Sequence, residues 1–293
     1  MKTCVLTGAT GVVGGALLRR LARGWRVHAL SRHREGADPE LANVTWVPLD
    51  LAAPWSAALL PARADAVVHA AQTPNYRRFP GCAEEIFEVG AGSTLRLLQY
   101  AAGAGASRFV LCSSGGVYGT TAAPAREEAP MPPEGEREFF LRCKIAGEQV
   151  AMAYRGMLDV VVARLFFVYG PGQPRGMLLP RLVDAVAAGR PVTLQGEAGL
   201  HLNPLHASDC ARALHRALEL PGSAVLNLGG PEVLSLRRVA EIIGAAVGRE
   251  PSFVVEPAGG PAFMAGDTER AARLLGAPRV RFADGVRDLL PPA

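Results

Sequence analysis

Short apolar runs alternate with stretches of helical periodicity along most of the chain. Residues 3–6 form the first apolar run, and Val13, Leu17, Leu18 and Leu21 then recur at the spacing of one helix face. Apolar runs of about four to eight residues are typical of buried strands, whereas a helical repeat of apolar positions is typical of an amphipathic helix. Their alternation predicts an α/β fold with a doubly wound parallel sheet. Further runs of strand length lie at 26–30, 44–49, 66–71, 108–112 and 160–168.

The first apolar run leads into the first amphipathic segment through a glycine-rich turn, Thr7-Gly8-Ala9-Thr10-Gly11-Val12-Val13-Gly14. In such a strand–turn–helix unit, backbone N–H groups and the helix N-terminus can hold a pyrophosphate. Gly8 suits the tight turn, Gly11 lets the backbone approach the phosphates, and Gly14 lets the helix lie close to the strand. An ordinary strand-to-helix turn is the alternative, but the flanking strand and helix favour a dinucleotide site. The residues predicted to bind the dinucleotide here are Gly8, Thr10, Gly11, Val12 and Val13.

Basic residues follow the second predicted strand, where the sequence reads Ser31-Arg32-His33-Arg34 and the first acidic residue is Glu35. In NAD-binding sheets, an acidic residue at this strand end usually holds the ribose hydroxyls of the adenosine. The hydroxyl of Ser31 and the guanidinium groups of Arg32 and Arg34 suit a 2′-phosphate instead. A solvated basic turn is the alternative interpretation. We therefore predict that the chain binds NADP(H) in preference to NAD(H).

The next two predicted strands add residues to the same site. Asp50 and Leu51 follow the third strand, where a carboxylate can accept a hydrogen bond from the adenine amino group. The fourth strand is apolar except for His69, and Ala70 and Ala71 at its end are predicted to lie against the cofactor. We interpret His69 as a buried imidazole bonded to the backbone rather than as a catalytic base.

Beyond residue 170 the composition changes, and shorter strand and helix patterns follow. We predict a Rossmann-type dinucleotide-binding domain over residues 1–170, with residues 203–228 returning to it. Residues 171–202 and 229–293 are predicted to form a smaller C-terminal α/β lobe that binds substrate. Such a lobe would cap the carboxyl edge of the sheet, where ligands of these sheets bind.

Composition and charge narrow the class of protein. The 293 residues are 49% hydrophobic with a mean hydropathy of +0.16, and no apolar run approaches the ~18–20 residues that cross a membrane. The net charge of +4 is spread along the chain, without the clustered basic and aromatic residues of a nucleic-acid surface. The expected partner is therefore a small molecule, and neither a nucleic acid nor a membrane is expected.

The five cysteines are scattered without metal-ligand spacing, so neither a metal site nor a disulfide framework is expected. Cys4 and Cys112 fall in predicted buried strands, which fits reduced thiols in a cytoplasm. The N-terminal segment is a predicted core strand and therefore resembles neither a signal peptide nor a transit peptide. We expect a cytoplasmic location.

Several segments together carry the pattern of one protein family. They are the glycine turn at 7–14, Ser113-Ser114-Gly115-Gly116-Val117-Tyr118-Gly119, Phe140-x-x-x-Lys144, residues 164–172, His206-Ala-Ser-Asp209 and Asn227-Leu-Gly-Gly. On these segments the chain resembles an extended short-chain dehydrogenase/reductase of the NAD-dependent epimerase/dehydratase type, over nearly its whole length. Together the motifs are specific for the family, though not for one substrate.

The resemblance implies a catalytic set of serine or threonine, tyrosine and lysine. Ser114 matches the family's serine, which hydrogen-bonds the substrate oxygen. Lys144 matches the family's lysine, which holds the nicotinamide ribose and lowers the tyrosine pKa. The tyrosine should stand four residues before that lysine, one helical turn away on the same face. Phe140 occupies this position, and a phenyl ring has no proton to give or take.

Three explanations of Phe140 are open at this point. The first is an engineered replacement of tyrosine that lets bound substrate survive, which the retained serine and lysine favour. The second is a natural enzyme that uses another group, with Tyr118, Cys143 or Glu138 as candidates. Each of these also has a structural explanation, as part of a family turn, as core packing or as a solvated first-turn acid. The third is a cofactor-binding protein that does not catalyse.

Two positions in the substrate region depart from the family pattern. In nucleotide-sugar members an asparagine usually stands at the position of Phe167, and an arginine that grips the pyrophosphate is common near Leu202. Both positions are apolar here, and a buried pyrophosphate without polar partners would be costly. A smaller or more apolar ketone or alcohol is therefore favoured, unless Arg175, Arg181 or His201 binds a diphosphate differently. Core packing explains Phe167 and Leu202 at least as well as a pocket role.

We predict an NADP(H)-dependent oxidoreductase that reduces a ketone, or oxidises a secondary alcohol, of a sugar derivative or secondary metabolite. Its activity would be impaired if Phe140 replaces the catalytic tyrosine. An NAD(P)-dependent sugar epimerase or dehydratase is the alternative, and a non-catalytic nucleotide-binding regulatory protein is the alternative of another class. The resemblance also implies a homodimer, formed through helices predicted at 84–102 and 138–154.

Overall fold

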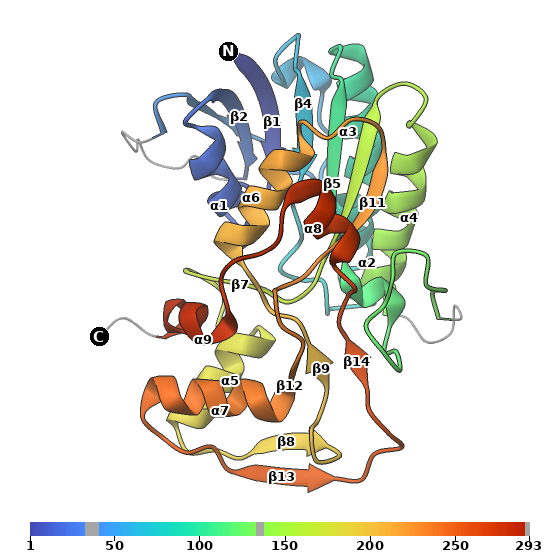
Figure 1. Cartoon of the computed structure of the whole chain (residues 1–293). Helices are drawn as coiled ribbons and strands as arrows, with labels where there is room; N and C mark the ends of the chain where they lie inside the picture. Colours follow the sequence, from blue (N-terminus) through green and yellow to red (C-terminus); the bar gives the residue numbers. More distant parts are fainter. Residues whose placement is uncertain (33–40, 133–137, 291–293) are drawn as a thin grey trace.

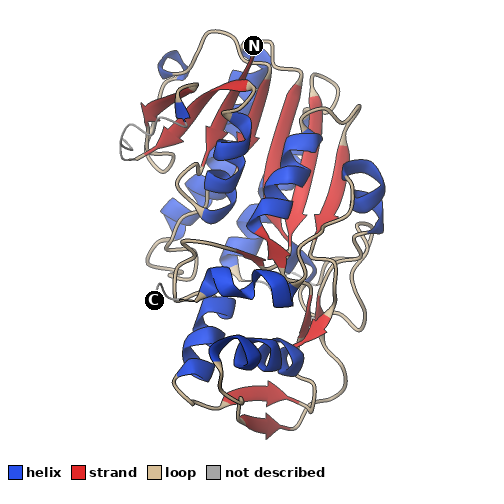
Figure 2. Cartoon of the chain, turned by 60° about the vertical axis from the view of Figure 1, so that its left-hand side comes forward, coloured by secondary structure: helices blue, strands red, loops and turns tan. Residues whose placement is uncertain are grey.

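The computed structural model describes residues 1–32, 41–132 and 138–290. A parallel sheet covered by helices on both faces forms the larger part, and a smaller region of short strands and helices lies beneath its lower edge (Figure 1). Figure 2 shows the helices packed across the sheet and the smaller region beyond the strand ends.

The sheet has seven strands in the order β11-β6-β5-β4-β1-β2-β3, and every pair is parallel. The predicted Rossmann-type doubly wound sheet is therefore confirmed. The strand order reverses between β1 and β4, and ligands of such sheets bind at the carboxyl ends beside this reversal. The strands are β1 (Lys2–Thr7), β2 (Trp25–Ser31), β3 (Val44–Pro48), β4 (Ala66–His69), β5 (Arg108–Ser114), β6 (Asp159–Leu165) and β11 (Ala224–Leu228).

Alternation along the strands supplies the core on each face of the sheet. Cys4 and Leu6 of β1 pack with Leu17 under one layer of helices, whereas Val5 between them packs with Leu97 under the other. Successive side chains of a strand point to opposite faces, so a strand covered on both faces is apolar throughout. The first layer contains α1 (Val12–Leu21), α6 (Ala207–Ala217) and α8 (Glu269–Leu275), and the second contains α3 (Ser93–Gly103) and α4 (Phe139–Ala153).

The helix predicted at 84–102 consists of three segments. They are α2 (Ala83–Phe87), the π-helical turn η3 (Glu88–Gly92) and α3. The carbonyl of Val89 accepts hydrogen bonds from the side chains of Ser93, at 2.8 Å, and His69, at 3.1 Å. A side chain that competes for a helix carbonyl favours a wider local turn, which explains the difference from a regular helix.

The smaller region has an apolar core of its own, which includes Leu179, Val183, Leu194, Val239 and Ile243. These side chains lie between two helices and the short strands below them. The elements are β7 (Val168–Tyr169), α5 (Leu178–Ala187), β8 (Val192–Gln195), β9 (His201–Leu202), β10 (Leu205–His206), β12 (Leu234–Ser235), α7 (Leu236–Val247), β13 (Phe253–Glu256), β14 (Phe263–Met264), α9 (Phe282–Gly285) and the turn η6 (Val286–Leu289). Two other single turns, η2 (Ala57–Leu59) and η4 (Gly115–Tyr118), lie elsewhere.

The described residues have neither a membrane-spanning helix nor a cluster of metal ligands. Within the part of the chain that the structure describes, no helix has both the length and the apolar character needed to cross a membrane. Among the same residues, no cluster of three or more His, Cys, Asp or Glu side chains has the arrangement of a metal site.

Candidate functional site

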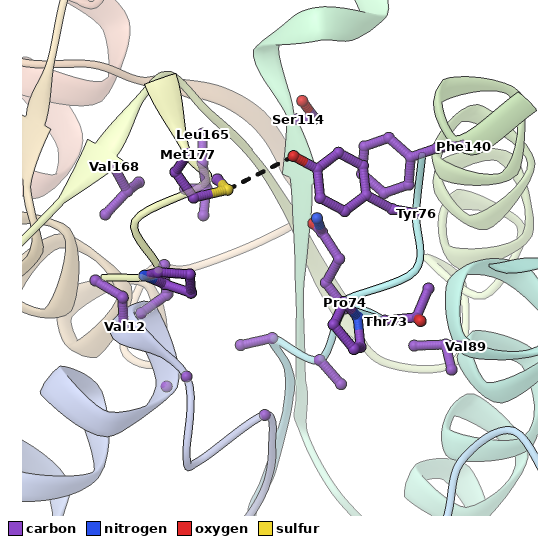
Figure 3. Close-up of a pocket in the computed structure, with 18 of the residues that line it drawn as sticks. Val12, Thr73, Pro74, Tyr76, Val89, Ser114, Phe140, Leu165, Val168 and Met177 are labelled. Atoms are coloured by element: carbon purple, nitrogen blue, oxygen red, sulfur yellow. Dashed lines mark hydrogen bonds between the residues drawn. The ribbon is translucent and has the colours of Figure 1, made fainter. Parts of the chain in front are cut away.

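A cavity of about 640 Å³ lies at the carboxyl ends of β1, β2, β4 and β5 and extends to α5 of the smaller region. Its position beside the reversal of strand order is the expected ligand site of such a sheet. In Figure 3, Val12 and Val168 lie on one side of the cavity, and Thr73, Pro74 and Val89 lie on the other. The sequence-predicted residues on its wall are Gly8, Thr10, Gly11, Val12, Val13, Ser31, Arg32, Asp50, Leu51, Ala70, Ala71, Ser114 and Phe140.

The glycine turn has a shape that only glycine permits. Gly8 has a φ of +69°, and a Cβ there would lie 2.6 Å from the carbonyl oxygen of Ala70. A Cβ on Gly14 would lie 2.1 Å from the carbonyl oxygen of Gly8. Gly11, which has no side chain to cap α1, precedes the helix, so first-turn N–H groups are left for an anion. These features fit the pyrophosphate of a dinucleotide.

Thr7 and His69 connect the glycine turn to the neighbouring strand. Thr7 Oγ1 accepts from the N–H groups of Ala70 and Ala71, both at 3.1 Å, and therefore donates its own proton to His69 Nδ1 at 2.7 Å. His69 Nε2–H in turn donates to the carbonyl of Val89. Burial, together with the positive charge of Lys144, lowers the pKa of His69 to about 3. The imidazole is thus neutral and structural, as the sequence predicts.

Near the carboxyl ends of β2 and β3, the cavity has both basic and acidic side chains on its wall. Arg32 lies there, while Arg34 falls outside the described residues. Asp50 Oδ1 accepts from the N–H of Ala52 at 2.9 Å, which leaves its other oxygen for a ligand. Glu85 also lines the cavity, and hydrogen bonds from Thr73 and Asn75 lower its pKa, with a smaller contribution from the charge of Arg32.

The matched catalytic residues occupy different depths. Ser114 lines the cavity, and its Oγ accepts from the N–H of Gly116 at 3.1 Å. Lys144 Nζ donates to the carbonyl of Cys112 at 3.0 Å and lies 5.7 Å from the centre of the Phe140 ring. Burial lowers the pKa of Lys144. The described residues on the cavity wall include Ser114 and Phe140 but not Lys144, which lies behind the ring.

The three side chains considered as replacements for tyrosine are not among the described residues that line the cavity. Tyr118 is 2% exposed, and its hydroxyl accepts from Arg164 at 2.6 Å and donates to Asn227 at 2.8 Å. Cys143 is buried in the core, and Glu138 is exposed just before α4. Tyr118 is therefore committed to a buried network, and a proton-transfer role for any of the three finds no support in this geometry.

A buried ion pair supports the wall behind Ser114. Glu148 on α4 accepts from the Nη2 of Arg164 on β6 at 2.7 Å, and both side chains are 6% exposed. Ser113 donates to the other oxygen of Glu148. Burial by itself would lower the pKa of Arg164, but the hydrogen bonds and charge of Glu148 raise it overall. The pair links β5, β6 and α4 at the point where Ser114 emerges.

On the substrate side, only one of the five residues considered from the sequence is on the cavity wall. Phe167 lines the cavity with a φ of +42°, a conformation that asparagine adopts far more readily than phenylalanine. Leu202 is fully buried in the core of the smaller region. Arg175 pairs with Asp184 and donates to the carbonyl of Leu289, Arg181 is exposed on α5, and His201 stacks on Phe263.

Tyr76 is a wall residue that the sequence does not reveal. It lies in the loop after β4, outside every motif, and its ring centre is 5.1 Å from that of Phe140. Its hydroxyl donates to Met177 Sδ at 3.5 Å (Figure 3). Only the folded chain brings this phenol beside the position of the missing tyrosine.

The chain is similar to known proteins over most of its length. The family model that matches it is described as the NAD dependent epimerase/dehydratase family and covers residues 4–229. A dTDP-glucose 4,6-dehydratase of Streptomyces niveus is 35% identical over 231 residues, which is 76% of this chain and 68% of the relative. A dTDP-4-dehydro-6-deoxy-D-allose reductase of a Streptomyces species is 27% identical over 277 residues, which is 87% and 84% respectively. The solved structure of MoeE5 in complex with UDP-glucose and NAD has a TM-score of 0.81 at 28% identity, covering 98% of this chain and 97% of that one.

Proposed function

The chain belongs to the NAD dependent epimerase/dehydratase family, whose relatives are NAD(P)-dependent oxidoreductases and epimerases, and we propose that it reduces a ketone with NADPH. The observation that carries this proposal is the position of Arg32 on the cavity wall, where an NAD-binding sheet usually has a carboxylate. A guanidinium there favours a 2′-phosphate. NADPH is the usual carrier of hydride for net reduction, and the reductase among the relatives supports this direction.

Different residues on the cavity wall would bind different parts of the cofactor and the substrate. The turn at 7–14 would hold the pyrophosphate, Ser31 and Arg32 the 2′-phosphate, and Asp50 the adenine. The bound cofactor would supply the hydride. Ser114 Oγ, which accepts from Gly116, keeps its own proton for the carbonyl oxygen of the substrate and orients that oxygen.

The substrate proposed is a ketone on a sugar derivative or secondary metabolite. The wall near Ser114 is apolar, with Phe166, Phe167, Met177 and Met264 along it, which suits a compact substrate. We assign substrate binding to residues 171–202 and 229–293, and cofactor binding to residues 1–170 with 203–228. A homodimer through the helical segments at 84–102 and 138–154, taken from the family resemblance, and a cytoplasmic location, taken from the cysteine pattern, complete the proposal.

The test is net consumption of reduced cofactor. Purified protein is mixed with compact sugar ketones that lack a nucleotide and, separately, with dTDP-4-dehydro-6-deoxy-D-allose, each with either NADPH or NADH, and absorbance of the reduced nicotinamide is followed. We expect turnover with NADPH to exceed that with NADH. Arg32→Ala should raise KM for NADPH at least about tenfold, since a charged hydrogen bond is worth about 1.5–3 kcal/mol, and leave KM for NADH unchanged. Arg26→Ala is the matched control, because Arg26 is exposed at the start of the same strand.

The alternatives give different results in the same assay. An epimerase returns the hydride to its substrate and consumes no cofactor, whereas a regulatory protein binds NADPH without any chemistry. Equal use of NADH, with no effect of Arg32→Ala, would refute the cofactor assignment.

A further inference from the structure

We propose that Tyr76 is the proton donor of this enzyme and replaces the hydroxyl that Phe140 lacks. The inference rests on the proposed ketone reduction and adds to it the group that completes proton transfer. Among the described residues that line the cavity, Tyr76 carries the only phenol. A hydroxyl group positioned beside the substrate oxygen is what general acid catalysis requires.

The Tyr76 ring lies beside the position that the family tyrosine would occupy. The Tyr76 ring packs on the Phe140 ring with centres 5.1 Å apart and planes inclined by 56°. Figure 3 shows the hydroxyls of Tyr76 and Ser114 on the cavity side of Phe140. The phenol thus enters from the loop after β4 toward the space that the family tyrosine would reach from α4. A proton can be delivered to the same substrate oxygen from the neighbouring ring.

The hydrogen bond that the Tyr76 hydroxyl makes is a weak one. The hydroxyl donates to the thioether of Met177 at 3.5 Å, and a thioether is a weak acceptor. A substrate carbonyl would be a stronger one, so the O–H group can turn to the substrate at little cost. Tyr118 is the contrast within this chain, since its hydroxyl is held at 2.6 and 2.8 Å by Arg164 and Asn227.

The loop that carries Tyr76 is anchored on both sides of this residue. Thr73 and Asn75 both donate hydrogen bonds to the carboxylate of Glu85 on α2, the second at 2.9 Å. Phe79, three residues after Tyr76, stacks on Phe139 of α4 with ring centres 4.6 Å apart. Anchors on both sides keep the phenol in a narrow range of positions, which catalysis by a loop residue needs.

A cation–π contact also holds the ring. The guanidinium carbon of Arg77 lies 5.0 Å from the centre of the Tyr76 ring, a distance at which the cation attracts the ring face. In the step itself, the ketone carbon gains a hydride, the carbonyl π pair moves to oxygen, and that oxygen takes the Tyr76 proton. NADPH becomes NADP⁺, and the phenolate regains a proton from water.

The experiment moves one hydroxyl between two adjacent rings. Tyr76→Phe should lower kcat about 10²- to 10³-fold, within the usual range for loss of a general acid, with KM for NADPH unchanged. Phe140→Tyr should be at least as active as the natural sequence. The double variant should regain activity to within about tenfold of Phe140→Tyr, a rescue that a merely structural role of Tyr76 would not produce. Tyr154→Phe, at the end of α4 and outside the described cavity wall, is the matched control.

A binding measurement gives a second readout without turnover. With NADP⁺ bound, Tyr76→Phe should bind dTDP-4-dehydro-6-deoxy-D-allose about five- to tenfold more weakly, as expected for one lost hydrogen bond, while its affinity for NADP⁺ stays the same. Unchanged kcat in Tyr76→Phe would overturn the role of Tyr76 and leave the proposed reduction standing. Activity in Phe140→Tyr alone, with none in the natural sequence, would overturn it as well. No reduction by any variant would refute the proposed function, and the inference with it.

Discussion

The two walls of the cavity are built in different ways. The glycine wall is the continuous segment 7–14, and its shape comes from backbone contacts, such as the one that leaves no room for a Cβ on Gly14. The side-chain wall comes from the loop after β4 and from β5, η4, α4, β6 and β11. At the cavity surface it consists of Tyr76, Ser113, Ser114 and Phe140, and behind them it is supported by the buried side chains of Tyr118, Glu148, Arg164 and Asn227.

This difference explains which wall tolerates change. The glycine wall depends on the absence of side chains, so any Cβ at its closest points disrupts it. The side-chain wall depends on a network in which one hydroxyl or carboxylate can be replaced by another in a nearby place. In the role proposed for Tyr76, a loop supplies the hydroxyl that Phe140 on α4 lacks, whereas Gly8 and Gly14 have no such substitute.

The largest expected effect is loss of the buried ion pair in the side-chain wall. Glu148→Gln leaves the Arg164 guanidinium buried with no carboxylate beside it, which should lower the free energy of unfolding by about 3–5 kcal/mol. Urea denaturation followed by circular dichroism measures this. Glu241→Gln is the control, since Glu241 pairs with Arg238 at the surface and should cost less than about 1 kcal/mol. Equal losses in both variants would mean that the buried pair contributes no more to the free energy of unfolding than the exposed pair.

The second prediction breaks the glycine wall. Gly14→Ala places a methyl group 2.1 Å from the Gly8 carbonyl oxygen, so backbone must shift. We expect a loss of about 3 kcal/mol, the upper end for overpacking, and at least tenfold weaker NADP⁺ binding by fluorescence titration.

The adjacent glycine supplies the control for that change. At Gly15 the nearest atom to an added Cβ is the Ala9 carbonyl oxygen at 3.3 Å. Gly15→Ala also gains about 1 kcal/mol of helix propensity, so its net effect should be within about 1 kcal/mol of zero. If the two variants lose the same stability, the close approach at Gly14 does not limit the fold.

The same contrast explains what the sequence could predict. Strand periodicity and the spacing of glycines act between residues close in the chain, and the predicted sheet, the glycine turn and the buried role of His69 all follow from such local patterns. The family resemblance identified Ser114 and showed that Phe140 stands where the family has a tyrosine. Each of these predictions needed only short segments of sequence.

The rest depends on contacts between distant segments. Tyr76 and Phe140 stand 64 positions apart in the sequence, and Tyr118 and Asn227 stand 109 positions apart. Tyr118 looked available from its turn but is buried and bonded, and Lys144 lies behind the Phe140 ring instead of on the described cavity wall. Which side chains can take part in a reaction depends on their burial and on their hydrogen-bond partners. Neither can be derived from the spacing of residues.

The smallest expected effect concerns His69, which lies on β4 between the two walls. Its pKa is about 3 in the folded protein because of burial, compared with an ordinary value of 6.5. As pH falls below 6.5, the unfolded chain takes up a proton that the folded chain refuses, so stability present at neutral pH is lost on the way toward pH 3. Between pH 7 and 5.5 this amounts to about 1 kcal/mol.

Comparing the pH dependence of two variants isolates that contribution. In His69→Gln the loss of unfolding free energy between pH 7 and 5.5 should be about 1 kcal/mol smaller than in the natural sequence. His28→Gln removes another histidine whose pKa burial lowers, but one that is partly exposed, and should keep the His69 contribution. The folded protein keeps the His69 ring neutral over this pH range, so the hydrogen bond between His69 and Thr7 at the base of the glycine turn stays unchanged. If the pH dependence of the unfolding free energy is the same in His69→Gln as in the natural sequence, the pKa of His69 is not lowered by folding. A neutral imidazole would then not link the two walls.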